Sequence, residues 1–172
     1  MARKVFYSFH YIPDNWRAAT VRNIRALEGN QPVSDNDWER VTRGGEIAIK
    51  NWINRQLEGR SCCVVLIGSQ TAGRKWINYE IKQAWDAGKG VVGVHIHNLK
   101  NAQGLQSTKG NNPLSYVNVP VRSPFGVISM KPLSGIAKAY DFNSSNSQSI
   151  YNAIVSNLEG LVDEAITIRK RY

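Results

Sequence analysis

The sequence lacks any apolar run that approaches the ~20 residues needed for a membrane-spanning helix. Its start, Met1–Lys4, leads into a predicted strand without the apolar core of a signal peptide. We therefore expect a cytoplasmic protein that has no membrane partner.

Cysteine is scarce, because Cys62 and Cys63 are the only two in the chain. They are adjacent in an apolar run that predicts a buried strand, where neighbouring side chains point to opposite faces. They cannot form a disulfide framework, and their spacing matches no zinc motif. We expect buried thiols and no metal site.

Several motifs that carry enzymatic chemistry are also missing, among them the P-loop, G-x-S-x-G and H-E-x-x-H. Residues 88–93 match the dinucleotide pattern G-x-G-x-x-G. However, they follow a predicted helix and open a strand, the reverse of the required order. We interpret them as the end of a helix followed by a strand.

Acidic residues are fewer than basic ones, 13 against 22, so the formal net charge is +9. This balance suits an anionic partner. The charge is scattered, and the one basic cluster, Arg169–Arg171, lies at the C-terminus. We do not expect a nucleic-acid partner, since no aromatic and basic residues interleave.

Strands and helices alternate over the first 98 residues, which predicts a parallel sheet with right-handed crossovers. The predicted class is therefore α/β, with helices on both faces of the sheet and a long C-terminal helix. The expected strands are 4–10, 62–67, 91–96, 127–130 and 139–142, and the expected helices are 16–27, 45–58, the helix after residue 75, and 147–168.

The rest of the chain has weaker patterns. Residues 29–36 are rich in turn formers, and residues 37–40 suggest only a short helical turn. Residues 99–124 are polar and predict a long loop, within an irregular region that spans 99–138. With no repeat and no second core, we expect a single domain over 1–172.

The carboxyl ends of parallel strands meet at one rim of a sheet, where such folds bind their ligands. Glu80 lies near the N-terminus of the helix that follows the strand 62–67, in about its first turn. It is interpreted either as an acid that stabilises its helix or as the carboxylate of a site. The rim also collects Phe9, His10, Ser69, His97 and Asn98.

Such a group suits a reaction with a positively charged, oxocarbenium-like transition state, which one carboxylate can stabilise. Trp76 and Tyr79 could stack on a nucleobase or pack in the core.

Two segments resemble TIR domains: Val5–Phe9, which is similar to the first-strand box of that family, and Trp76–Glu80, which is similar to its Trp-Cys-x-x-Glu motif. The nearer resemblance is to the TIR-like ThsB subunit of bacterial Thoeris antiphage systems. It extends over Lys4–Tyr11, Trp76–Ile81 and the loop Lys109–Pro113.

The resemblance implies a flavodoxin-like fold. It also implies an NAD glycohydrolase or ADP-ribosyl cyclase, which breaks the nicotinamide–ribose bond of NAD as substrate, without a separate cofactor. Arg17 or Lys75 is a candidate for the pyrophosphate, although a solvent-facing place is expected for each. Glu80 would be catalytic, and the expected substrate-binding residues are Ser8, Phe9, His10, Ser69, Trp76, Tyr79, His97, Asn98 and Asn112.

The product implied by the resemblance is a signalling nucleotide, either a cyclic ADP-ribose isomer or a related ADP-ribose conjugate. It would diffuse to a separate antiphage effector, after a phage-derived trigger, and the protein could form a homo-oligomer. Ile77 replaces the usual cysteine, and the Arg-Asp-x-x-Pro-Gly loop of scaffold TIR domains is missing. The alternative is a non-catalytic TIR-like or flavodoxin-like sensor or scaffold.

Overall fold

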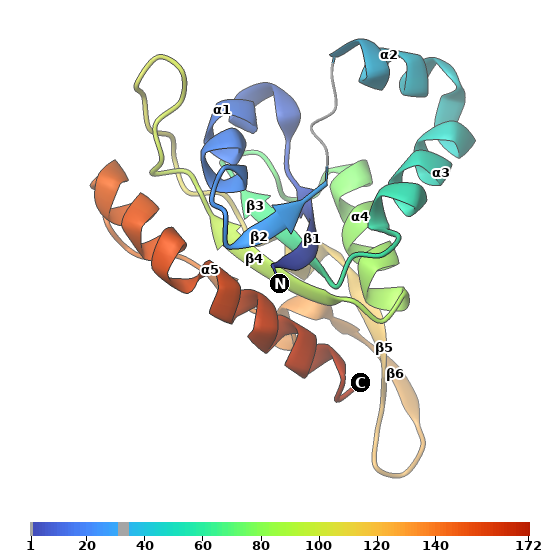
Figure 1. The fold of residues 1–172 in the computed structure, drawn as a ribbon. Helices are drawn as coiled ribbons and strands as arrows, with labels where there is room; N and C mark the ends of the chain where they lie inside the picture. Colours follow the sequence, from blue (N-terminus) through green and yellow to red (C-terminus); the bar gives the residue numbers. More distant parts are fainter. Residues whose placement is uncertain (1, 31–34) are drawn as a thin grey trace.

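The computed structural model describes residues 2–30 and 35–172. Within them, five parallel strands form one sheet in the order β2-β1-β3-β4-β7 (Figure 1). This is the flavodoxin-like strand order, so the predicted α/β class is confirmed. The strands are β1 (Arg3–Ser8), β2 (Leu27–Gly29), β3 (Cys62–Ile67), β4 (Gly90–His95) and β7 (Ala139–Tyr140).

Helices cover both faces of this sheet (Figure 1). On one face α1 packs together with α5, and on the other α3 packs together with α4. The predicted long C-terminal helix is α5. The helices are α1 (Tyr11–Arg22), α2 (Asp35–Arg43), α3 (Gly45–Leu57), α4 (Lys75–Asp86) and α5 (Ser147–Arg169).

The central strand β3 is buried along its whole length and divides the core in two. Cys62 belongs to the hydrophobic cluster under α1 and α5, whereas Cys63 belongs to the cluster under α3 and α4. Both thiols are free and fully buried, as predicted from the alternation of side chains along a strand.

The first helix differs from its prediction. It begins at Tyr11, not at residue 16, because Pro13 sits in its first turn, where the missing N–H costs nothing. It ends at Arg22, so Leu27 is not its last inward residue. Leu27 instead opens the short edge strand β2, whose residues were expected partly in the helix and partly in the turn-rich connection that starts at Gly29. Residues 31–34 of that connection lie outside the described residues, and Asp35 and Asn36 begin α2.

Residues 99–138 are more ordered than expected. The stretch predicted as a loop to residue 124 contains the short helix η1 (Pro113–Tyr116) and the strand β5 (Asn118–Arg122). β5 pairs antiparallel with β6 (Ile128–Pro132), which overlaps the predicted strand 127–130, and η2 (Leu133–Gly135) follows. Pro120 inside β5 argued against a strand in the sequence, since proline within a sheet is largely confined to edge strands. In the two-stranded sheet, β5 is such an edge strand.

Among the described residues, no helix is both long and apolar enough to cross a membrane.

Candidate active site

Glu80 and Ser8 meet where β1 ends. Glu80 lies on α4, which starts at Lys75, so it is in the second turn and not in the first as expected. The helix dipole, which acts mainly within the first turn, therefore does not explain why an acid stands at position 80. The fully buried Ser8 is the last residue of β1, and its hydroxyl donates a short hydrogen bond to Oε2 of Glu80.

The surroundings of Glu80 favour its neutral form. Burial raises the pKa of the Glu80 carboxyl to about 8, and the hydrogen bond from Ser8 opposes that rise. The other oxygen, Oε1, has no hydrogen-bond partner among the described residues. A carboxyl group with one oxygen held and the other free is positioned to act on a ligand.

A cavity of about 380 Å³ lies against this carboxyl group. Its walls are largely aromatic: Phe9 follows β1, Trp16 lies on α1, and Trp38 and Trp52 come from α2 and α3. The two tryptophans pack edge to face, with ring centroids 5.8 Å apart. Its volume falls in the range of small-molecule sites, and aromatic walls suit a planar ring.

One cation, Arg22, lines the cavity among the described residues. Its guanidinium donates a hydrogen bond to the carbonyl oxygen of Asn30 and lies 6.0 Å from the centre of the Tyr7 ring. Burial lowers the pKa of Arg22, because charge is less favoured away from water. Asn30 in turn accepts a hydrogen bond from the backbone N–H of Tyr7 through its side chain.

Of the residues predicted for the site, Phe9 and Glu80 line this cavity, and Ser8 contacts Glu80 without lining it. Trp76 and Tyr79 do not line it. They pack edge to face with centroids 5.8 Å apart, and the Tyr79 hydroxyl donates to Oδ1 of Asn54 on α3.

The other predicted residues lie elsewhere on the rim. His10 occupies the N-cap position of α1 without a side-chain capping hydrogen bond, and burial together with the positive charge of Arg74 lowers its pKa. Ser69 follows β3 in a turn and is half-buried. Asn98 donates to the carbonyl of Ser144, and Asn112 accepts from the N–H of Leu114.

His97 is buried beside His95 at the end of β4, with the two rings 5.8 Å apart. Burial lowers the pKa of His97, and it lowers that of His95 to about 4. The nearby pair Lys109 and Asp141, 3.0 Å apart, acts on both imidazoles. These neutral histidines form a second polar group, apart from the cavity.

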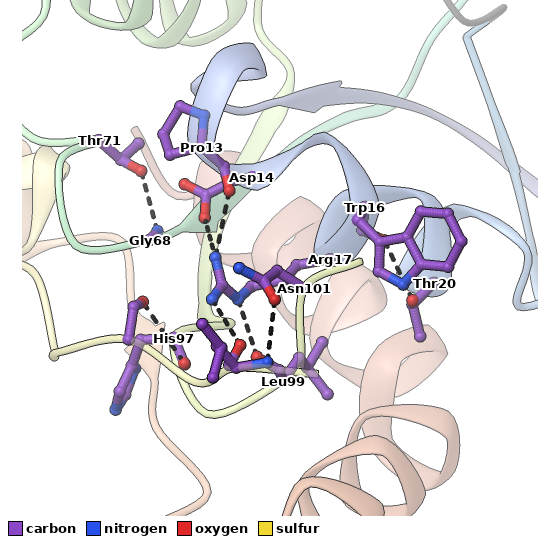
Figure 2. Close-up of polar contacts among 12 residues, drawn as sticks. Pro13, Asp14, Trp16, Arg17, Thr20, Gly68, Thr71, His97, Leu99 and Asn101 are labelled. Atoms are coloured by element: carbon purple, nitrogen blue, oxygen red, sulfur yellow. Dashed lines mark hydrogen bonds and ion pairs between the residues drawn. The ribbon is translucent and has the colours of Figure 1, made fainter. Parts of the chain in front are cut away.

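Arg17, a candidate for the pyrophosphate, is buried and not solvent-facing. Figure 2 shows its guanidinium between Asp14 of α1 and the loop after β4. It pairs with Asp14 at 3.1 Å and donates to the carbonyls of Leu99 and Leu105. Gly68 lies so close to the Asp14 carboxyl that a Cβ there would collide with it. Arg17 therefore has a structural role.

Comparison with known proteins agrees with this architecture. Residues 6–101 match the family model described as "Thoeris protein ThsB, TIR-like domain". The chain belongs to the ThsB TIR-like family. The part of this ThsB TIR-like chain that matches the family contains Ser8, Glu80 and the aromatic walls of the cavity.

One relative is a protein of Bacillus cereus (strain MSX-D12) whose name is "Putative cyclic ADP-D-ribose synthase ThsB1". It is 38% identical over 122 residues, which is 68% of this chain and 64% of that protein. The chain thus matches somewhat less than two thirds of the length of this curated relative.

Several cavity residues were missed in the sequence. Trp38 lay in a segment with an ambiguous pattern, and Trp52 and Arg22 lay on helices whose partners were unknown. Only the high number of tryptophans, five in 172 residues, hinted at an aromatic site.

Proposed function

We propose that this ThsB TIR-like chain is an enzyme that breaks the bond between nicotinamide and ribose in NAD. The observation that carries the proposal is the Glu80 carboxyl group, held by Ser8 at the wall of an aromatic cavity. The name of the Bacillus cereus relative, a cyclic ADP-D-ribose synthase, supports the same substrate and a cyclic product.

The reaction leaves a positive charge on the sugar. The bond between C1′ of the ribose and the ring nitrogen breaks, and its electron pair leaves with nicotinamide. An ionised Glu80 next to the developing oxocarbenium ion would stabilise it electrostatically. An adenine nitrogen of the same molecule could then attack C1′ to give a cyclic ADP-ribose isomer, or water could give ADP-ribose.

The raised pKa of Glu80 fits a cationic substrate. In the empty cavity, burial keeps much of the carboxyl protonated at neutral pH, since the pKa is about 8. The pyridinium ring of NAD is positive, and a positive neighbour lowers the pKa of a carboxyl group. We expect substrate binding to release a proton from Glu80 and so to activate it.

The remaining contacts with NAD are proposed from the positions of the predicted residues along the rim of the sheet. Phe9 at the cavity, with His10 beside it, would meet the nicotinamide end. Ser69, His97, Asn98 and Asn112 lie along the same rim and would contact the rest of the dinucleotide, with Trp76 and Tyr79 supporting α4. The released nucleotide would signal to a separate antiphage effector.

The test measures nicotinamide release and nucleotide products by mass spectrometry. It uses purified protein with NAD and, because a phage-derived trigger is expected, lysates of infected cells. We expect Glu80→Gln to lower the rate by at least about 100-fold, the scale of one lost electrostatic group. Exposed Glu159 on α5 gives the matched control Glu159→Gln, which should keep the wild-type rate. Equal product from Glu80→Gln and wild type would remove the proposal and favour the scaffold alternative.

A further inference from the structure

The hairpin of β5 and β6, residues 118–132, exposes apolar side chains. It extends away from the body of the protein (Figure 1). At its tip Phe125 is 94% exposed, and Val127, Ile128 and Met130 are each more than half exposed. Clustered exposed apolar groups of this kind mark an interaction site.

Only one face of the hairpin is used by the fold. Val119 of β5 is fully buried in the cluster under α3 and α4. In the antiparallel register Ile128 pairs with Arg122, and Met130 pairs with Pro120. These four residues share the opposite face, and all of them are exposed. The exposed apolar side chains therefore do not pack against the hydrophobic core of the protein.

The charged residues of the hairpin itself, Arg122 and Lys131, are both basic. Between residues 87 and 140 the sequence contains six lysines and arginines and no aspartate or glutamate. This stretch alone carries +6 of the net charge of +9. Two of the six, Arg122 and Lys131, lie on the hairpin and make no ion pair with any described residue. The surface is thus complementary to an anionic one.

We propose that this hairpin is a peripheral membrane-binding arm, whose apolar tip enters an anionic lipid surface. Arg122, the cation nearer the tip, would lie at the level of the headgroups. The lack of a spanning run led us to expect no membrane partner, but that argument concerns spanning helices and not an inserted tip. The proposal does not depend on the activity proposed for Glu80.

The dimensions agree with such a contact. Arg122 is three residues before Phe125, and even extended residues advance by only about 3.3 Å each, so it lies at most about 10 Å from the tip. Elements that lie in a membrane interface bury their apolar side chains about 5–10 Å deep. Phe125 would then reach the acyl boundary while Arg122 remains among the phosphates.

Other occupants fit less well. Two copies of the chain joined through this face would bring the Arg122 side chains together without an acid. Nucleic acid would use the cations and leave the apolar tip in water. An anionic lipid surface would bind the cations at its headgroups and bury the apolar tip among its acyl chains. It needs no cleft that matches a narrow arm.

The test is co-sedimentation of the full chain with vesicles. One set contains only phosphatidylcholine, and the other contains equal parts of phosphatidylcholine and phosphatidylglycerol. We expect binding to the anionic set alone, reduced at high salt. Phe125→Ser should weaken partition at least about ten-fold, since a phenylalanine would no longer be buried. The matched control is Ile47→Ser on α3, where the isoleucine is 75% exposed, and it should bind as wild type does.

A second measurement locates the contact. Cys62 and Cys63 are fully buried. In the folded Phe125→Cys variant, an environment-sensitive thiol dye would therefore react only with the cysteine introduced at position 125. Its emission should shift to the blue with anionic vesicles. No wild-type binding to them, equal binding by Phe125→Ser, or no blue shift would overturn the proposal. So would a dimer in light scattering that Phe125→Ser separates, because the arm would then join two copies.

Discussion

At the scale of single residues, the contact between Ser8 and Glu80 decides what the site can do. Burial favours the protonated carboxyl, whereas the Ser8 hydroxyl favours the ionised form by donating a hydrogen bond to it. Ser8, expected to bind substrate, is fully buried and points at Glu80. This location suits Ser8 for positioning the Glu80 carboxylate through the hydrogen bond.

We predict that Ser8→Ala raises the pKa of Glu80, because it removes the contact that stabilises the ionised form. The midpoint of the pH profile of kcat/KM for NAD cleavage should move up by about one unit. KM, measured well above that midpoint, should change little. The exposed Ser129 gives the control Ser129→Ala, which should keep the wild-type midpoint. A lower rate with a higher KM and no shift would instead place Ser8 in contact with the substrate.

At the scale of elements, Arg17 joins α1 to the loop that follows β4. The two elements are far apart in the sequence, and the guanidinium connects them through the carbonyls of Leu99 and Leu105 (Figure 2). The buried Asp14 balances its charge. Because α1 also supplies Trp16 to the cavity, this clamp holds one wall of the site in place.

Replacing Arg17 with methionine should destabilise the protein by about 3 kcal/mol, because a buried carboxylate loses its partner. Urea denaturation measures this change. Hydrogen exchange should also speed up in residues 99–112, where the loop loses its anchor. Arg25→Met, at an exposed position on the connection after α1, should change stability by no more than about 0.5 kcal/mol. If the loop stayed protected in Arg17→Met, the clamp would not be what orders it.

At the scale of the whole molecule, buried titratable groups limit the pH range of the fold. Burial lowers the pKa of His95 from 6.5 to about 4, so stability falls as pH drops below 6.5, because the unfolded chain binds more protons. The pKa of Glu80 is raised from 4.5 to about 8. Stability therefore also falls as pH rises through that window, because the folded chain binds more protons.

Between pH 4.5 and 6.5 these two effects oppose each other, and above 6.5 the loss from Glu80 dominates. We predict that the free energy of unfolding decreases by about 1 kcal/mol between pH 6.5 and 8. Urea denaturation across this range measures it. Glu80→Gln should abolish the decrease, and Glu159→Gln should retain it. A flat wild-type profile would show that Glu80 titrates normally.

Much of the sheet was predictable because its pattern is local. Apolar runs such as 62–67 indicate buried strands by themselves, and the steps of four in 45–58 predict a helix. The errors fell where a short element depends on a distant neighbour. Leu27 forms a three-residue strand only because β1 lies beside it, and residues 118–122 form a strand only because 128–132 return along them.

The candidate site was predictable in part. Phe9 follows a predicted strand and Glu80 projects nearby, so the sequence places both at one rim, whereas Ser8 was expected from the segment that resembles TIR domains. Trp38 and Trp52 were not predictable, since the packing of α2 and α3 against the rest of the fold brings them to the cavity. The same holds for Arg17, whose carbonyl partners Leu99 and Leu105 lie more than 80 residues away.

The sequence by itself determined the fold class and the rim at which the candidate site lies, because hydrophobic periodicity and strand-end positions are properties of neighbouring residues, and its resemblance to TIR domains singled out Glu80. Only the tertiary structure decided which side chains enclose that acid, how strongly its proton is held, and which cation is a clamp. Burial and partner distance depend on segments that the chain brings together from far apart, and no local pattern records them.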